Sequence, residues 1–248
     1  AYRQLEVLMA FISLRDADGL VKQKDIFKKT GTSAASSLNA LVKKGVLIKE
    51  KKEVSRLKDY SALKSPDDIL ITDHQRHAYE SIIQLFKEKN TVLLHGVTSS
   101  GKTEIYIRLI SEYIALGKQV LYLLPEIALT TQIINRLRRY FGDKVGVYHS
   151  RYSEYERVEI WQRVLDFNKS TANTSKYQII LGARSAVFLP FTELGLVIVD
   201  EEHDASFKQY EPAPRYNGRD TALYLAGLHG AKTVLGSATP SVESYFQA

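Results

Sequence analysis

The sequence contains no cysteine among its 248 residues, and it has only one methionine and one tryptophan. Without cysteine it cannot carry a disulfide framework, a thiolate zinc site, an iron–sulfur cluster or a cysteine nucleophile. No apolar run approaches the roughly 20 residues of a membrane-spanning helix, and residues 1–11 lack the features of a signal peptide. We therefore expect a cytoplasmic protein with no membrane partner.

The charge that is present is unevenly distributed. The net charge is +6, and residues 1–65 carry 14 of the 34 basic side chains but only 7 of the 28 acidic ones. The rest of the chain is close to neutral. This asymmetry predicts a basic module that binds a polyanion, joined to a nearly neutral body. The alternative is a lysine-rich surface that is merely solvated.

Residues 1–62 are predicted to form a winged-helix domain that binds DNA. Apolar spacing predicts three helices and then two short strands around the basic tip at 49–52. The helices are expected over 2–14, 23–30 and 33–44, and the strands over 46–48 and 53–57. Three helices followed by a basic hairpin is the layout of a winged helix, although such domains also serve as protein-docking modules. Residues 63–68 are predicted to be a linker.

Residues 69–248 alternate apolar strand-like runs with amphipathic helices. The expected strands are 91–95, 120–124, 145–148, 178–181, 196–199 and 233–235. The expected helices are 103–116, 129–141, 153–167 and 218–228. This alternation predicts an α/β fold, with a parallel sheet covered by helices on both faces.

The segment from Gly96 to Thr103 matches the phosphate-binding pattern G-x-x-x-x-G-K-[ST] between an expected strand and an expected helix. The backbone amides and the helix N-terminus are expected to bind phosphate. Lys102 would reach the β- and γ-phosphates of ATP, and Thr103 would bind Mg²⁺. The candidate nucleotide-binding residues here are Gly96, Thr98, Ser99, Ser100, Gly101, Lys102 and Thr103.

Two carboxylates follow the apolar run 196–199 directly. Ligands of such sheets bind at the carboxyl ends of the strands. Asp200 is expected to hold magnesium through its water shell, and Glu201 to polarise the attacking water. With Lys102, these are the candidate catalytic residues of an ATP hydrolase. The alternative is that they are surface carboxylates after a strand.

A proline-broken loop after these acids mixes aromatic and basic residues. This composition suits stacking on unpaired bases, although the rings could instead pack on the domain. The candidate nucleic-acid contacts are Phe207, Lys208, Tyr210, Arg215 and Tyr216. Arg184 and Ser185 are weaker candidates for contacts to DNA phosphates.

Several segments resemble the superfamily-two helicases. The phosphate-binding segment, the DEEH run at 200–203 and the GSATP run at 236–240 look like helicase motifs I, II and III, and LPEIALT at 124–130 looks like motif Ia. LLPEIALT, GARSAVF at 182–188 and DEEHDASFKQYEPAPRYNGRD at 200–220 resemble the wording of the PriA family of primosomal replication-restart helicases. Gln75 is similar to the glutamine that reads adenine, and Ser237 and Thr239 match residues that couple hydrolysis to DNA engagement.

The resemblance implies a RecA-like first motor lobe in an ATP- and Mg²⁺-dependent 3′-to-5′ DNA helicase that acts at stalled forks. It implies forked and single-stranded DNA, single-strand DNA-binding protein and primosome components as partners. A second lobe, a DNA 3′-end-binding domain and a zinc-binding insertion are expected only in the rest of a longer protein, of which this chain is expected to be a fragment.

Two other classes remain open at the level of sequence. One is a DNA-binding ATPase switch or regulator, which would not need the segments that resemble motifs Ia and III. The other is another superfamily-two translocase, including an RNA helicase, because no single residue separates DNA from RNA.

Overall fold

The structure is a computed structural model that describes residues 2–15, 19, 21–49, 64–97, 100–150, 152–168 and 177–248. The chain divides into two compact units, Ala1–Val54 and Ser55–Ala248. The boundary expected at residue 62 falls in a segment outside the described residues. Among the described residues, no helix is both long and apolar enough to cross a bilayer.

The first unit contains the three predicted helices. Helix α1 spans Tyr2–Leu14, α2 spans Gln23–Thr30, and α3 spans Ala35–Lys43 after a 3₁₀ turn, η1, at Thr32–Ala34. Their shared core consists of Val7, Ile26, Ala34, Leu38, Leu41 and Leu47. Two of the predicted helices have the expected bounds, and the third begins with a 3₁₀ turn in place of a regular α-helical one.

The buried face of α1 differs from the pattern that predicted the helix. Of the apolar residues Leu5, Leu8, Met9 and Ile12 whose spacing predicts this helix, Leu8 packs against the core, whereas Leu5, Met9 and Ile12 are 56%, 61% and 48% exposed. Helix α1 instead buries Val7 and Ala10, which lie on the side that packs against α2 and α3. The periodic apolar positions were sufficient to predict the helix but not the side that is covered.

The expected wing is only partly within the described residues. Residues 46–48 form a bend and irregular chain, so the strand predicted there is wrong. A strand requires a hydrogen-bonded partner, and the expected partner, 53–57, lies outside the described residues. The sequence of the third helix predicts four exposed short polar residues, Ser33, Ser36, Ser37 and Asn39; Ser33, Ser36 and Asn39 are exposed, and Ser37 is half-buried.

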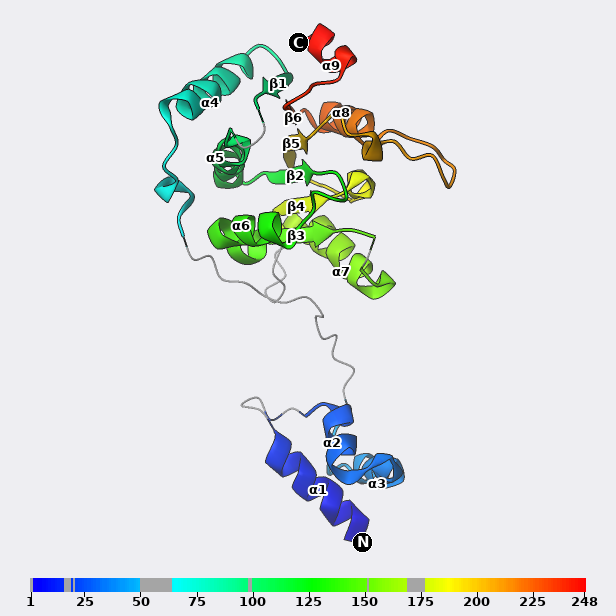
Figure 1. Ribbon diagram of the computed structural model, residues 1–248. Helices are drawn as coiled ribbons and strands as arrows, with labels where there is room; N and C mark the ends of the chain where they lie inside the picture. Colours follow the sequence, from blue (N-terminus) through cyan, green and yellow to red (C-terminus); the bar gives the residue numbers. More distant parts are fainter. Residues whose placement is uncertain are drawn as a thin grey trace. The chain divides into compact units, whose positions relative to one another are not determined.

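The second unit is built on a six-stranded parallel sheet in the order β1-β6-β5-β2-β4-β3 (Figure 1). The strands are β1 Thr91–His95, β2 Gln119–Leu123, β3 Val145–Tyr148, β4 Ile179–Gly182, β5 Leu194–Asp200 and β6 Lys232–Ser237. All six lie within two residues of their predicted bounds. Strands β2 and β5 are buried almost throughout, as apolar runs in a parallel sheet require.

Helices cover both faces of this sheet, as predicted. The described helices of this unit are α4 Asp73–Leu85, α5 Lys102–Ala115, α6 Thr131–Phe141, α7 Glu154–Leu165, α8 Gly218–His229 and α9 Val242–Gln247, of which α9 buries no residue. The 3₁₀ turns are η2 Pro66–Asp68, η3 Gly142–Lys144, η4 Asp166–Asn168, η5 Arg184–Phe188 and η6 Ala205–Phe207. Helices α4, α5 and α6 pack on one face, and α7 and α8 pack on the other (Figure 1).

The alternation of side chains along β5 divides the core between these two faces. Leu196 and Ile198 belong to the cluster under α4, α5 and α6, whereas Val197 and Val199 belong to the cluster under α7 and α8. Because all strands are parallel, the loops after β1, β5 and β6 leave the sheet at one edge. These loops carry the phosphate-binding segment at 96–103, the DEEH run at 200–203, called the acidic segment below, and the GSATP segment at 236–240.

Candidate nucleotide and nucleic-acid sites

The phosphate-binding segment joins β1 to α5, where the sequence predicted it. Gly101 has φ 84°, a left-handed conformation that glycine adopts without strain. The Lys102 Nζ donates a hydrogen bond to the Gly96 carbonyl at 2.9 Å, so the lysine is turned back onto its own loop. Thr98 and Ser99 lie outside the described residues.

A cavity of about 370 Å³ opens beside this segment. It is lined by Gly101, Lys102, Thr103, Glu104, Arg136, Asp200 and Glu201. The structure therefore brings the predicted phosphate-binding and acidic residues together at one site. Sequence reasoning missed Arg136, which forms an ion pair with Glu104 across this cavity; it lies on α6 with no motif around it.

Gln75 connects helix α4 to the phosphate-binding segment. Its Oε1 accepts from the Thr72 amide at 2.8 Å and completes the N-terminal cap of α4. Its Nε2 donates to the carbonyl oxygens of Ser100 and Gly101 at 3.3 and 3.4 Å. A Cβ added at Gly101 would lie 1.8 Å from this nitrogen, so Gly101 also provides the space that Gln75 occupies. Adenine recognition by Gln75 stays a prediction.

Asp200 ends β5 with both carboxylate oxygens hydrogen-bonded. Tyr106 on α5 donates to Oδ1 at 3.1 Å, and Tyr122 on β2 donates to Oδ2 at 3.1 Å. Burial raises the pKa of Asp200, and the two tyrosine hydroxyls oppose that rise because they stabilise the ionised form. Neither tyrosine was a candidate from the sequence, because each is indistinguishable from a core aromatic.

Glu201 is the one non-glycine residue with positive φ among the described residues, at φ 50°. Such a conformation is uncommon for residues with a side chain and is typical of functional turns. Its Oε1 lies 3.9 Å from the Lys102 Nζ, and its Oε2 lies 3.7 Å from the His203 Nδ1. The turn therefore directs this carboxylate into the cavity beside the lysine.

Glu202 points away from that cavity and is 2% exposed. Its carboxylate accepts from the Arg219 Nη1 at 2.9 Å, the Ser241 amide at 2.7 Å and the Ser244 Oγ at 2.7 Å. Burial alone would raise the pKa of Glu202, but these donors hold it below its ordinary value. Glu202 thus joins the acidic segment to α8 and α9 and has no free oxygen for water or metal.

The two residues predicted to couple hydrolysis to DNA engagement both contact the acidic segment. The His203 Nδ1 lies 2.7 Å from the Oγ of Ser237, and its Nε2 lies 3.2 Å from the Oγ1 of Thr239. Ser237 is buried, and its carbonyl accepts from the Gly96 amide at 3.0 Å. One hydrogen-bonded chain therefore runs from the phosphate-binding segment through Ser237 to His203.

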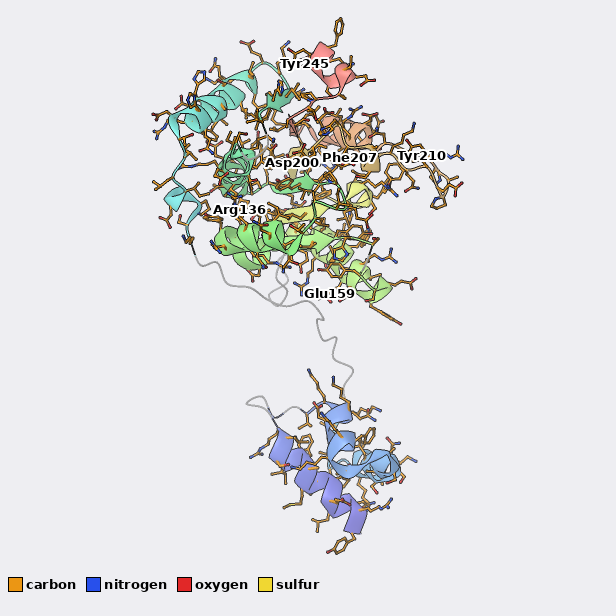
Figure 2. The ribbon with its side chains drawn as sticks, in the orientation of Figure 1. Arg136, Glu159, Asp200, Phe207, Tyr210 and Tyr245 are labelled. Atoms are coloured by element: carbon orange, nitrogen blue, oxygen red, sulfur yellow. The ribbon has the colours of Figure 1, made fainter. Side chains whose placement is uncertain are left out.

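The aromatic loop after the acidic segment projects from the body of the unit between η6 and α8 (Figure 1). Its two arms pair at Lys208 and Asn217, and the Gln209 amide donates to the Tyr216 carbonyl at 2.8 Å. Tyr210 is 61% exposed on this projection, with the Lys208 Nζ 5.1 Å from its ring centroid (Figure 2). Arg215 is exposed on the same loop.

Phe207 does not belong to this exposed group, so its predicted contact with nucleic acid is wrong. Its ring is 2% exposed and lies in the core beneath α8 (Figure 2). The short turn η6 points Phe207 inward before the loop projects. Phe207 lies at the base of the loop, where its ring packs into the adjacent core. The composition of the loop does not distinguish such a buried ring from an exposed one.

Phe188 is an exposed aromatic that sequence reasoning missed. It ends η5, is 60% exposed and meets the Tyr216 ring edge-on, with centroids 4.9 Å apart. In the same turn, the Arg184 Nη1 donates to the Ser206 carbonyl at 2.8 Å, so Arg184 holds the base of the aromatic loop. Ser185 beside it is partly exposed. Phe188 ends the run GARSAVF, whose small and apolar residues are typical of a buried turn, so the sequence does not indicate that its ring is exposed.

A parallel sheet with a phosphate-binding loop after β1 and a carboxylate pair after β5 defines a P-loop nucleoside triphosphatase. Residues 72–247 match the DEAD/DEAH box helicase family, and residues 1–54 match the winged helix domain of PriA helicases from Bacteroidota. The first match covers more than half of the chain, so the chain belongs to the DEAD/DEAH box helicase family. Membership implies that this domain binds ATP.

Within that family the chain is a relative of the replication restart protein PriA. It is 39% identical to that protein of Bacillus subtilis (strain 168) over 252 residues, covering 100% of this chain and 30% of the relative. It is 39% identical to that of Synechocystis sp. over 234 residues, covering 94% of this chain and 27% of the relative. The chain thus spans less than a third of these relatives.

Solved structures are more distant. The Mycobacterium smegmatis helicase Lhr bound to ssDNA and AMP-PNP matches with a TM-score of 0.47 and 19% identity, over 73% of this chain and 26% of that one. The Sulfolobus solfataricus SWI2/SNF2 ATPase core in complex with dsDNA matches with a TM-score of 0.45 and 15% identity, over 75% and 35%.

Proposed function

We propose that this chain is the winged helix and first motor lobe of an ATP-dependent 3′-to-5′ DNA helicase that restarts replication at stalled forks. Single-strand DNA-binding protein and primosome components are its proposed partners. The observation that carries the proposal is the common edge of β1, β6 and β5. The phosphate-binding segment, the GSATP segment and the acidic segment meet there, and the aromatic loop leaves from the same place.

The residues at this edge fit a nucleotide with a hard divalent cation. Mg²⁺ prefers oxygen ligands, and the cavity presents the Thr103 hydroxyl and the Asp200 carboxylate. Bound Mg²⁺ would neutralise charge on the transferred phosphoryl group. Lys102 leaves the Gly96 carbonyl and binds the β- and γ-phosphates, while the backbone amides of 96–103 bind the remaining oxygens. Gln75 contacts the adenine.

Glu201 orients the attacking water. Its turn conformation directs the carboxylate into the cavity, 3.9 Å from the Lys102 ammonium that would mark the phosphate position. A carboxylate there accepts a hydrogen bond from water and polarises it toward phosphorus. Glu202 does not take this role, because its oxygens are occupied by Arg219, Ser241 and Ser244.

Single-stranded DNA lies along the aromatic loop and the adjoining turn η5. Tyr210, Tyr216 and Phe188 present ring faces or edges for base stacking. Lys208, Arg215, Arg184 and Ser185 supply charge or hydrogen bonds for the phosphates. The basic first unit adds a second DNA contact through its winged helix.

His203 transmits the state of the DNA-binding loop to the nucleotide site. It lies between Glu201 on one side and Ser237 and Thr239 on the other. A shift of the aromatic loop, which follows His203 after Asp204 and η6, would alter these contacts and the position of Glu201. This relay makes hydrolysis respond to DNA.

The test compares ATP hydrolysis by the full-length protein with single-stranded DNA, with RNA of the same sequence, and without nucleic acid. We expect DNA to stimulate turnover well above both controls. Greater stimulation by RNA would favour an RNA helicase. Equal rates in all three conditions would favour an ATPase switch.

A further inference from the structure

The carboxylate proposed to hold magnesium is fixed by two phenols from separate elements. The hydroxyl of Tyr106, from the second turn of α5, reaches Oδ1 of Asp200, and that of Tyr122, the penultimate residue of β2, reaches Oδ2, each at 3.1 Å. Both tyrosines are 0% exposed. Their rings pack edge to face, with centroids 5.5 Å apart and an interplanar angle of 75°.

The fold makes specific room for this arrangement. Gly236 on β6 pairs with Asp200 across the sheet, and a Cβ added there would lie 1.7 Å from the Tyr106 Oη. Any other residue at 236 would displace the phenol from the carboxylate. Four elements, α5, β2, β5 and β6, therefore converge on one carboxyl group.

Both phenols act as donors to an ionised group. A phenol hydroxyl carries its proton at neutral pH and an ionised carboxylate oxygen can only accept, so each tyrosine is the donor in its bond to Asp200. Each carboxylate oxygen has two lone-pair sites. One tyrosine on each oxygen fixes the plane of the carboxylate. Oδ1 also accepts from the Glu201 amide at 3.2 Å, so the second site of Oδ2 stays open for the water shell of a cation.

Resting on the nucleotide site proposed above, we propose that Tyr106 and Tyr122 are positioning residues that orient the Asp200 carboxylate for Mg²⁺. They contact neither nucleotide nor cation. Partners that orient a metal-binding carboxylate typically change metal affinity by about 10–100-fold when they are removed. The pair sets the magnesium concentration that the nucleotide site requires.

The test measures binding of a fluorescent ATP analogue to the full-length protein, first in EDTA and then across a Mg²⁺ titration. Tyr106→Phe and Tyr122→Phe each remove one hydroxyl and keep the ring. We expect each to raise the Mg²⁺ concentration at half-maximal enhancement of binding roughly tenfold. Affinity in EDTA should stay within twofold of the unaltered protein, which separates orientation of Asp200 from damage to the phosphate-binding loop.

Tyr113→Phe is the matched control, because Tyr113 lies seven residues further along α5 and packs against the same core. It should leave the Mg²⁺ midpoint unchanged. Asp200→Asn sets the upper limit of the effect. If one phenylalanine variant fails to fold, the other carries the test, since the two hydroxyls act on different oxygens.

The outcomes separate the two proposals. An unaltered protein that does not bind the analogue at all would overturn the nucleotide site and this inference together. Mg²⁺-dependent binding with midpoints in both phenylalanine variants within twofold of the unaltered value would overturn this inference alone. A loss of affinity of equal size with and without Mg²⁺ would also overturn it, because that result indicates a purely structural role.

Discussion

The imidazole of His203 lies 2.7 Å from the hydroxyl of Ser237, although 34 residues separate them. Ser237 ends β6, and its carbonyl also receives the first amide of the phosphate-binding segment, Gly96, at 3.0 Å. Ser237 therefore forms one hydrogen bond with the phosphate-binding segment, through Gly96, and another with His203, which precedes the aromatic loop.

Lys102→Ala should weaken binding of ATP and Mg²⁺ and leave the fold intact. Lys102 is the first residue of α5, and its Nζ contacts only the Gly96 carbonyl and, at 3.9 Å, the Glu201 carboxylate among the described residues, not the core. We expect an affinity loss of about ten- to a hundredfold, because a charge-assisted contact to phosphate contributes roughly 1.5–3 kcal/mol. Calorimetry measures it. Lys144→Ala, near the opposite edge of the sheet, is the control, and equal ATP affinity for both variants would refute the assignment.

Glu201→Gln should separate hydrolysis from binding. The amide keeps the size of the side chain but is a poor base, so turnover should fall by about 10²–10⁴-fold. ATP affinity should change little. Steady-state ATPase and nucleotide titration of the full-length protein measure both quantities. Unchanged turnover would mean that another residue orients the water.

Arg219→Ala should destabilise the protein without acting at the nucleotide site. It leaves the buried Glu202 carboxylate without its cationic partner, at a cost of about 3 kcal/mol in the free energy of unfolding. Thermal or denaturant unfolding measures the loss. Arg139→Ala, on the exposed side of α6, should be nearly neutral; a similar loss in both variants would contradict the network.

Glu202 should also contribute a pH dependence to stability. Its folded-state pKa lies below the ordinary value of 4.5, so its stabilisation is present above that pH and is lost as the pH falls through the folded-state pKa. Unfolding of the unaltered protein should therefore become easier below about pH 4.5. In Glu202→Gln this acid-dependent loss should be smaller, although the variant is less stable at neutral pH. Parallel pH curves for both proteins would argue against the contribution.

The exposed rings and the buried ring should behave in opposite ways. Tyr210→Ala and Phe188→Ala should each lower affinity for single-stranded DNA about ten- to a hundredfold, at about 1–3 kcal/mol per stacked base, independent of sequence. Phe207→Ala should instead cost about 3–5 kcal/mol of stability through its cavity. DNA titration and thermal unfolding of all three variants test this. Lower melting temperatures with unaltered DNA affinity in the first two would indicate packing roles.

The alternating pattern of the second unit was predictable because each apolar run or amphipathic helix carries its own period. The phosphate-binding segment and the acidic pair were predictable because their residues are adjacent in the sequence. Tyr106 and Tyr122 were not, since their approach to Asp200 depends on three strands and a helix packing together. Phe207, expected to contact DNA, is buried, and Phe188, for which no role was predicted, is exposed, for the same reason: burial of a single ring depends on which neighbour covers it.

Strand β1 has one neighbour in the described sheet, β6, with Thr91 opposite Thr233. Roughly 140 residues separate these partners, so during synthesis β1 leaves the ribosome well before the strand that it pairs with. The other strands can assemble first, whereas the strand that leads into the phosphate-binding loop joins the sheet last. Closing such a long loop is slow, because chain entropy is lost before the contact is gained. A nascent or truncated chain that lacks β6 would hold the four strands β5, β2, β4 and β3, and would leave β1 and the phosphate-binding loop that follows it outside the sheet.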